Sequence, residues 1–257
     1  FPGLSGMAKM AGIMDDLRKN PPAEIGGYKV ASVTDYQDTE KTGLPKINDL
    51  KLGFSRDGFH FSRGSYSNFL SSSRHKGSWD YGYLHPANGI CTVAGDKLHF
   101  YYSAFSGASP HFGSHKYSGG AVGVATLRRD GFAAMVTENG NGTLLTEKLT
   151  YAGNHFFVNA DCSQGELWAE LLDAEGHPLP GYTRAECCTL RGKDSTRWEL
   201  HWNAKGEQTP WPQVMRVRFG LQNAKLYAFW ITDSAEGKSH GYLAAGSPEA
   251  NARGKDE

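Results

Sequence analysis

The sequence predicts a mostly-β protein: partial β-propeller blades followed by an antiparallel β-sandwich, with a short helix-and-strand leader before them. From about Leu52 onward, short runs of β-branched and aromatic residues alternate with turn residues, and helical periodicity does not recur. Several runs alternate apolar and polar side chains, as in an antiparallel sheet with one solvated face. We therefore divide the chain into a leader (1–50), a blade-like region (51–138), a sandwich (139–246) and a disordered tail (247–257).

The leader is expected to hold one amphipathic helix and one strand. Apolar residues recur at helical spacing between Met7 and Leu17, and Asn20-Pro21-Pro22 must end that helix. The run Tyr28–Val33 has the composition of a strand. One helix and one strand cannot bury their own apolar faces, so the leader needs another surface to pack on.

In the blade-like region, turn signals separate the expected strands. Asp57-Gly58, between two apolar runs, is the strongest short-range signal for a hairpin. The turn Gly95-Asp96 leads into a predicted strand at 97–102, and a further strand is expected at 121–127.

The sandwich region contains the clearest strand patterns. Strands are expected at 143–146, 156–159, 165–172, 198–202, 215–219 and 226–231. The run 215–219 alternates cleanly between apolar and polar residues, whereas 226–231 is apolar on both faces and predicts a central strand. Asn139-Gly140-Asn141-Gly142 predicts an exposed loop.

The composition argues against two classes of partner. The 27 basic and 27 acidic residues cancel, so nothing favours nucleic acid, and no apolar run is long enough for a membrane span. Aromatic residues make up 12% of the chain. Flat rings of this kind suit stacking on sugars, although the cores of β-sandwiches also contain many aromatic residues.

No cofactor is expected from the motifs. The four cysteines lack CxxC spacing, and no glycine-rich phosphate loop opens a helix. Cys187 and Cys188 are adjacent, so on an extended strand they point to opposite sides. We interpret the cysteines as structural thiols, with one disulfide bridge possible.

Residues 52–246 resemble the C-terminal part of bacterial proteins similar to glycoside hydrolase families 32 and 43, in which a five-bladed propeller precedes a β-sandwich. The segments that carry the resemblance are 54–59, 77–80, 95–98 with 101–102, 127–132, 158–161, 226–230 and the closing 241–246. It implies a carbohydrate-related function. The catalytic carboxylates of that family lie in earlier blades, so it also implies that a complete two-carboxylate active site is lacking here.

Residues 4–50 resemble a different family, the bacterial phosphohexomutases, over a segment that enters their last domain. The segments that carry this resemblance are Gly6–Met10, Ile13–Arg18, Asn20-Pro21-Pro22, Glu24–Gly27, Asp35-Tyr36 and Thr42–Pro45. The family works with a phosphoserine, a magnesium-binding aspartate cluster and a phosphate-gripping loop. None of these motifs is found in the sequence, so a phosphosugar mutase fragment is only a second alternative.

Asp80 is the candidate catalytic residue, because a Trp-Asp pair begins the inner strand of a blade in related propellers. Trp79 would stack on a sugar, and His85 would hydrogen-bond its hydroxyl groups. Glycoside hydrolysis needs two such carboxyl groups, one protonated and one ionised. In the structural alternative, Trp79 plugs the blade and Asp80 caps a turn.

Three further residues are candidate substrate contacts. His111 and His115 lie in a loop, where sugar contact from the rim is more plausible than metal binding, because the helical geometry of a ligand pair is absent. Arg128, followed by Arg129, could grip a carboxylate or sulfate on an acidic sugar. The alternative for this pair is an ion pair at the blade edge.

The sequence thus predicts a carbohydrate-related protein whose enzymatic activity depends on a second acid. The alternative is a non-catalytic β-sandwich module that binds glycan or packs on a partner. An unfinished propeller exposes sheet edges and apolar surface, so self-association through those edges is also expected.

Overall fold

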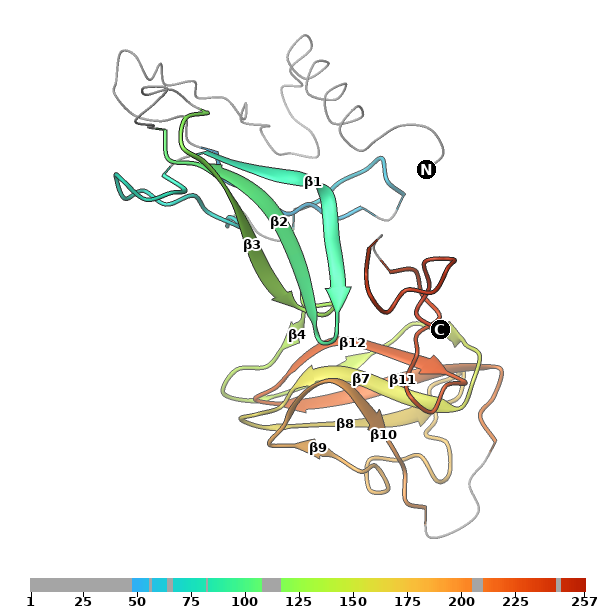
Figure 1. Ribbon diagram of the computed structural model, residues 1–257. Helices are drawn as coiled ribbons and strands as arrows, with labels where there is room; N and C mark the ends of the chain where they lie inside the picture. Colours follow the sequence, from blue (N-terminus) through green and yellow to red (C-terminus); the bar gives the residue numbers. More distant parts are fainter. Residues whose placement is uncertain are drawn as a thin grey trace. The chain divides into compact units, whose positions relative to one another are not determined.

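A computed structural model describes residues 48–257, except for 56, 64–66, 82, 108–116, 205–209 and 244–245, and omits the side chains of 87–90. Within this part the protein is built of strands and loops and contains no helix (Figure 1). The mostly-β prediction is confirmed. The predicted leader helix and strand, His111 and His115 lie outside the described residues.

The described residues contain twelve strands. In chain order they are β1 (Tyr83–Ala94), β2 (Lys97–Phe105), β3 (Gly120–Arg128), β4 (Met135–Val136), β5 (Asn141–Leu145), β6 (Leu149–Thr150), β7 (His155–Asp161), β8 (Glu166–Leu172), β9 (Leu190–Arg191), β10 (Asp194–Leu200), β11 (Val214–Gln222) and β12 (Lys225–Thr232). These strands belong to two compact units. The first comprises residues 48–91 and 99–125, and the second comprises residues 92–98 and 126–257.

The first sheet has the strand order β1-β2-β3. β2 and β3 form where β-branched and aromatic residues predicted them, and Gly95 turns between β1 and β2 with a φ of 57°. No sequence pattern predicted the full length of β1, because Pro86, Asn88 and Gly89 interrupt its apolar residues. On one face of this sheet Leu84 and Ala104 are fully buried.

The chain turns back at Asp57-Gly58, as predicted, but one isolated antiparallel bridge stands in place of the two expected strands. Phe54 and Ser62 form an antiparallel bridge with two backbone hydrogen bonds of 2.8 Å. Gly58 takes a φ of 77°, which favours glycine. The Asp57 carboxylate accepts hydrogen bonds from the backbone N–H groups of Phe59 and His60, both 2.8 Å long. Asp57 therefore stabilises this turn.

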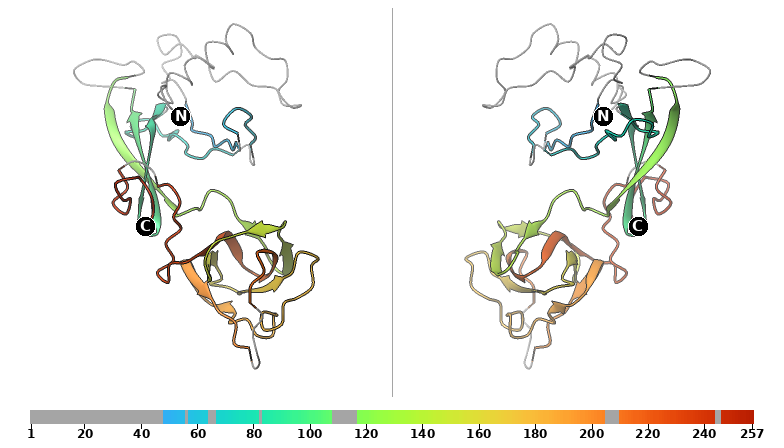
Figure 2. Two further views of the ribbon diagram at one scale, coloured as in Figure 1. Left: turned by 90° about the vertical axis from the view of Figure 1, so that its right-hand side faces the viewer. Right: turned by 90° about the vertical axis from the view of Figure 1, so that its left-hand side faces the viewer.

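The second unit contains two antiparallel sheets, which Figure 2 shows from two sides. One has the order β10-β7-β12-β4 and the other the order β5-β11-β8-β9, with β6 also paired to β11. In the second sheet Val217 pairs with Leu171 and Phe219 with Ala169, and all four side chains are buried. The alternation read at 215–219 is thus the inward face of β11.

Inward side chains of both sheets form one hydrophobic core. Its eighteen buried residues, among those described, are Phe156, Val158, Ala160, Cys162, Leu167, Ala169, Leu171, Leu179, Tyr182, Leu190, Leu200, Trp202, Met215, Val217, Phe219, Leu221, Ala224 and Leu226. Phe156 stacks on Phe229 at 5.9 Å, and on the opposite face of the same strands Phe157 stacks on Trp230 at 5.6 Å. β12 is therefore a central strand with two apolar faces, as predicted.

The C-terminal segment differs from the disordered tail that its small and charged residues predicted. Ser247 and Asp256 are buried. The Asp256 carboxylate accepts hydrogen bonds from Lys238 Nζ at 3.2 Å and Arg129 Nη2 at 3.0 Å, and from the Ser239 backbone N–H at 3.1 Å. Composition indicated solvent exposure because it does not reveal that two cations elsewhere in the unit meet this carboxylate.

The structure also decides two local expectations. Asn141 and Gly142, expected in a loop, begin β5 and pair with Gln222 and Leu221. Only the preceding residues are a bend, where Asn139 has a φ of 55°. The four cysteines, for which one bridge was possible, are all free thiols. None of the described residues belongs to a helix that could cross a membrane.

Candidate functional site

Trp79 and Asp80 lie in the turn that precedes β1. The Trp79 ring is 44% exposed and packs on Tyr102, with ring centroids 5.9 Å apart and an angle of 31° between the planes. Gly123 on β3 makes room for both rings. A Cβ atom at that position would lie 2.6 Å from Trp79 and 2.6 Å from Tyr102. The turn therefore presents a half-exposed indole supported by a buried phenol.

The Asp80 carboxylate lies within electrostatic reach of the Tyr102 phenol. Burial raises the pKa of Tyr102, and the charge of Asp80 raises it further, so the carboxylate lies close to the phenol. The Asp80 backbone carbonyl accepts a 3.1 Å hydrogen bond from the Ser73 N–H. The main chain of Asp80 thus holds the turn, and no described residue donates a hydrogen bond to its carboxylate.

His85 is exposed and lies apart from this pair. Its ring packs on Tyr83, with centroids 6.5 Å apart, and Tyr83 also contacts Phe105 at 5.6 Å. Leu84 lies between Tyr83 and His85 in β1, and it is buried together with Tyr102. Successive strand residues point to opposite faces, so His85 lies on the face of the sheet away from the Tyr102 ring. The predicted trio is therefore divided.

The first unit has few acids that could act together with Asp80. Its described residues contain three carboxylates, Asp49, Asp57 and Asp80. Asp49 accepts hydrogen bonds from the Ser72 N–H at 2.9 Å and Arg74 Nη2 at 2.6 Å. Burial would raise the pKa of Asp49, but these bonds and the Arg74 charge lower it overall. The bonds from His60 and Phe59 likewise lower the pKa of Asp57.

Arg128 belongs to the second unit and is held on several sides. Its Nε donates a 2.6 Å hydrogen bond to Asn159 Oδ1, and its Nη2 donates a 3.3 Å bond to the Ala160 carbonyl. Its Nη1 forms an ion pair with Asp194. The guanidinium carbon lies 4.7 Å from the centre of the Tyr227 ring, within cation–π range.

Two β-bulges flank the backbone to which Arg128 is bound. Asn159 and Ala160 lie on β7, which pairs with β10 on one side and with β12 on the other. The pairing with β10 shifts between Ser195 and Trp198, and the pairing with β12 shifts across Tyr227. A bulge bends its strand and re-aims a side chain. Here the bulge in β12 contains the aromatic residue that lies against Arg128.

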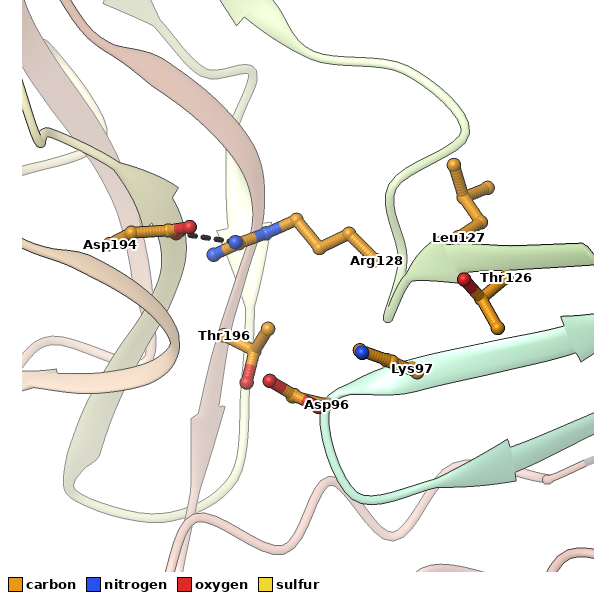
Figure 3. A pocket seen from close by; sticks show the side chains of 7 residues that line it. All are labelled: Asp96, Lys97, Thr126, Leu127, Arg128, Asp194 and Thr196. Atoms are coloured by element: carbon orange, nitrogen blue, oxygen red, sulfur yellow. Dashed lines mark hydrogen bonds and ion pairs between the residues drawn. The ribbon is translucent and has the colours of Figure 1, made fainter.

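An open pocket of about 240 Å³ adjoins Arg128 (Figure 3). Three segments of the second unit supply its walls: the turn between β1 and β2, the end of β3, and the bulged part of β10. The lining residues are Asp96, Lys97, Thr126, Leu127, Arg128, Asp194 and Thr196. Figure 3 shows Arg128 turned toward Asp194, while Asp96 and Thr196 extend from different segments into the same space.

The Arg129 side chain is bound by carboxylates of the protein itself. It forms ion pairs with Glu249 at 3.0 Å and with Asp256 at 3.0 Å, and its backbone N–H donates to the Asp96 carbonyl at 2.8 Å. Both members of the Arg128-Arg129 pair are therefore engaged with carboxylates of the protein. This favours the ion-pair interpretation over capture of an acidic sugar.

Sequence reasoning named only Arg128 among the residues of this pocket. Asp96 had the composition of a turn residue and nothing more, and Asp194 and Thr196 lie in a polar stretch without a motif. The bulges depend on how β7 pairs with both neighbours. No local pattern predicts that pairing, so the pocket becomes visible only in three dimensions.

Comparison of the chain with family models, with curated proteins and with solved structures gives no match. The two family resemblances rest on the residues quoted for them. In the described part of the chain, no three His, Cys, Asp or Glu side chains converge in a way that could hold a metal ion.

Proposed function

We propose that this chain is a carbohydrate-binding protein that does not cleave glycosidic bonds by the two-carboxylate route. The observation that carries the proposal is the exposed Trp79 ring, supported by Tyr102 and placed next to the Asp80 carboxylate. Residues 52–246 would correspond to the last blade and the β-sandwich of a protein similar to glycoside hydrolase families 32 and 43.

The chemistry of this cluster suits a sugar ring. The apolar face of a sugar packs on an aromatic face, and the hydroxyl groups at its edge donate hydrogen bonds to a neighbouring carboxylate. Trp79 supplies the first kind of contact and Asp80 the second. Tyr102 holds the indole in place, because it packs against Trp79 from the buried side.

The acids of the first unit argue against hydrolysis. Two-acid glycosidases place their carboxyl groups about 5 to 9.5 Å apart and keep one of them protonated by raising its pKa. Asp49 and Asp57 are bonded to other groups of the protein, and the pKa of each is lowered. Neither is suited to be the protonated partner of Asp80.

The architecture also supports the proposed ancestry. A three-stranded sheet in the first unit is compatible with part of a propeller blade, and two antiparallel sheets around one core are compatible with a β-sandwich.

The test is a titration of the full chain with β-linked and fructosyl oligosaccharides by isothermal calorimetry. We expect Trp79→Ala to weaken binding about tenfold or more, and Asp80→Asn to weaken it by a smaller factor. Phe59→Ala is the matched control, because Phe59 is an aromatic residue of the same unit with 76% exposure. Equal affinity for wild type and Trp79→Ala would overturn the assignment of this cluster.

A parallel assay addresses catalysis. Chromogenic β-glycosides and fructosides are incubated with wild type and with Asp80→Asn, and we expect no turnover above background from either protein. Hydrolysis by wild type that Asp80→Asn abolishes would show that a second acid completes the site, and would refute the non-catalytic proposal.

The second candidate is a structural module that packs on a partner. It is favoured by the outer face of β3, where Val122 is 78% exposed and Val124 is 52% exposed. An apolar strand face of this kind is suited to packing against another chain, including a second copy of this one.

A further inference from the structure

We infer that the pocket beside Arg128 is a second ligand site, and that its ligand is a neutral, hydroxyl-rich molecule the size of one sugar ring. This inference rests on the proposed function for the chemical class of the ligand. The site itself belongs to the second unit and contains none of the residues of the Trp79 cluster.

The pocket has the features of a built site. Arg128 is fixed by a side-chain amide, a backbone carbonyl and a carboxylate, and by the Tyr227 ring. Asn159, which accepts from Arg128, is fully buried and donates a 2.6 Å hydrogen bond to the Arg129 carbonyl. An arginine held by this many contacts is pre-organised, which lowers the entropy lost when a ligand binds.

The bulges give a second, independent indication. A regular β10 would pair residue for residue with β7, but its register shifts between Ser195 and Trp198, and Thr196 of that stretch lines the pocket. β12 has its own shift at Tyr227, on the other side of β7. Bulges cost ladder hydrogen bonds and gather next to functional sites, where they aim side chains. Two of them at one level of β7 therefore point to a site.

The charges of the lining residues cancel, which selects a neutral ligand. Asp194 takes up the charge of Arg128 in an ion pair. Asp96 and Lys97 are adjacent and of opposite sign, and neither side chain has a hydrogen-bond or ion-pair partner within the described residues. A carboxylate or sulfate would have to displace Asp194 from Arg128, whereas a hydroxyl group does not.

The uncommitted polar groups match the hydroxyl groups of a sugar. The Asp96 carboxylate can accept from two of them, Lys97 donates, and the Thr196 hydroxyl does either. The volume of about 240 Å³ is below the roughly 300–1,000 Å³ of sites for drug-sized ligands, so one ring fits and an oligosaccharide would extend outward.

The experiment measures saturation-transfer difference NMR of the full chain with glucose, galactose, xylose, arabinose and fructose, and with glucuronate and glucose 6-sulfate as anionic probes. Asp96→Asn and Thr196→Val are the pocket variants, and the double variant Asp96→Ala/Lys97→Ala removes both uncommitted charges. Glu138→Ala and Lys148→Ala are matched controls, because both residues are exposed in the same unit. Circular dichroism and thermal melts establish that each variant is folded.

We expect one or more neutral sugars to bind in the millimolar range, with about tenfold loss in the double variant and no change in the controls. The inference is overturned if the pocket variants bind as wild type does, or if the anionic probes bind more tightly than every neutral sugar. Loss of binding in Trp79→Ala alone would refute this second site and leave the proposed function intact. Loss of binding in the pocket variants alone would support this second site and refute sugar binding by the Trp79 cluster. No binding to wild type would refute both.

Discussion

The two units of this protein differ in how much apolar surface they bury. In the second unit, side chains from two sheets close a core of eighteen buried residues, whereas the buried cluster of the first unit contains Leu84, Tyr102 and Ala104. Of the thirteen large apolar side chains that are exposed among the described residues, eight lie in the first unit, including Phe59 and Val122. A single sheet covered on one face cannot exclude water from the other. The difference teaches that buried apolar surface, the main source of stability, is concentrated in the second unit.

The largest expected effect is on the core of the second unit. Phe156→Ala removes a ring that is 1% exposed and contacts Trp202, Phe219 and Phe229. We expect it to lower the free energy of unfolding by about 3–5 kcal/mol, because a cavity replaces the ring. Urea denaturation followed by circular dichroism measures this. Phe59→Ala, at an exposed site of the first unit, should change it by less than about 0.5 kcal/mol. Similar losses of unfolding free energy in the two variants would contradict the view that stability is concentrated in the second unit.

The next effect concerns the buried carboxylate of the C-terminal segment. Asp256→Asn leaves Arg129 and Lys238 without their shared anion, although both keep some exposure to water. We expect a loss of about 2–3 kcal/mol, below the full cost of breaking a fully buried pair. The same denaturation curves provide the value. Glu257→Gln is the control from the same segment. If it lost as much unfolding free energy as Asp256→Asn, the stabilising role of the Asp256 carboxylate would be contradicted.

A smaller effect is expected at Gly123, and it links stability to the proposed sugar site at Trp79. Gly123→Ala places a methyl group 2.6 Å from the rings of Trp79 and Tyr102, so one ring must move. We expect a loss of about 1–3 kcal/mol from overpacking, together with weaker sugar binding in calorimetry. In Gly140→Ala the nearest atom to the new methyl group would be 4.0 Å away, so this control should bind sugar normally. Unchanged sugar binding by Gly123→Ala would separate Trp79 from recognition.

Asp256 also predicts a pH dependence. Burial would raise the pKa of Asp256, but hydrogen bonds from Ser239 and Lys238 and the Arg129 charge lower it overall. Its contribution to stability is therefore fully present above the unfolded pKa of about 3.9 and is lost as the pH falls through the folded pKa. The difference in unfolding free energy between wild type and Asp256→Asn should shrink between about pH 5 and pH 2. A constant difference over that range would refute this role.

The smallest effect on stability is expected on the outer face of β3. Val122→Lys changes a side chain that is 78% exposed, so the free energy of unfolding should change by less than about 0.5 kcal/mol. A charge on this face opposes pairing with another chain. If the wild type self-associates there, sedimentation velocity will show a lower association constant for the variant. An equal constant would place any self-association elsewhere.

The strands that the sequence predicted are those whose side chains alternate or are strongly apolar, such as β11 and β12. β1 could not be recognised, because Pro86 and Gly89 lie within it and its length depends on pairing with β2. The burial of Asp256 could not be inferred either, since Arg129 lies 127 positions away in the chain. Local patterns report local geometry, and long-range ion pairs leave no trace in them.

The candidate sites follow the same rule. Trp79 and Asp80 lie together because they are neighbours in the chain, and the alternation along β1 then separates them from His85. Arg128 stood out as one of two adjacent arginines, but its partners Asn159 and Asp194 come from two other strands. The register shift that adds Thr196 to the pocket arises from pairing between strands, so it could not be predicted from the residues alone.

The tie between the β1–β2 turn and the C-terminal segment bears on how the chain can fold. Ser247 Oγ accepts a hydrogen bond from the Val93 N–H, and Glu249 accepts one from the Gly95 N–H, each pair 154 positions apart. Contacts this distant require a very large loop to close before they contribute any stability, and such topologies fold slowly. The turn at residues 92–98 must therefore wait for the rest of its unit, and during synthesis it is among the last segments to find its native partners.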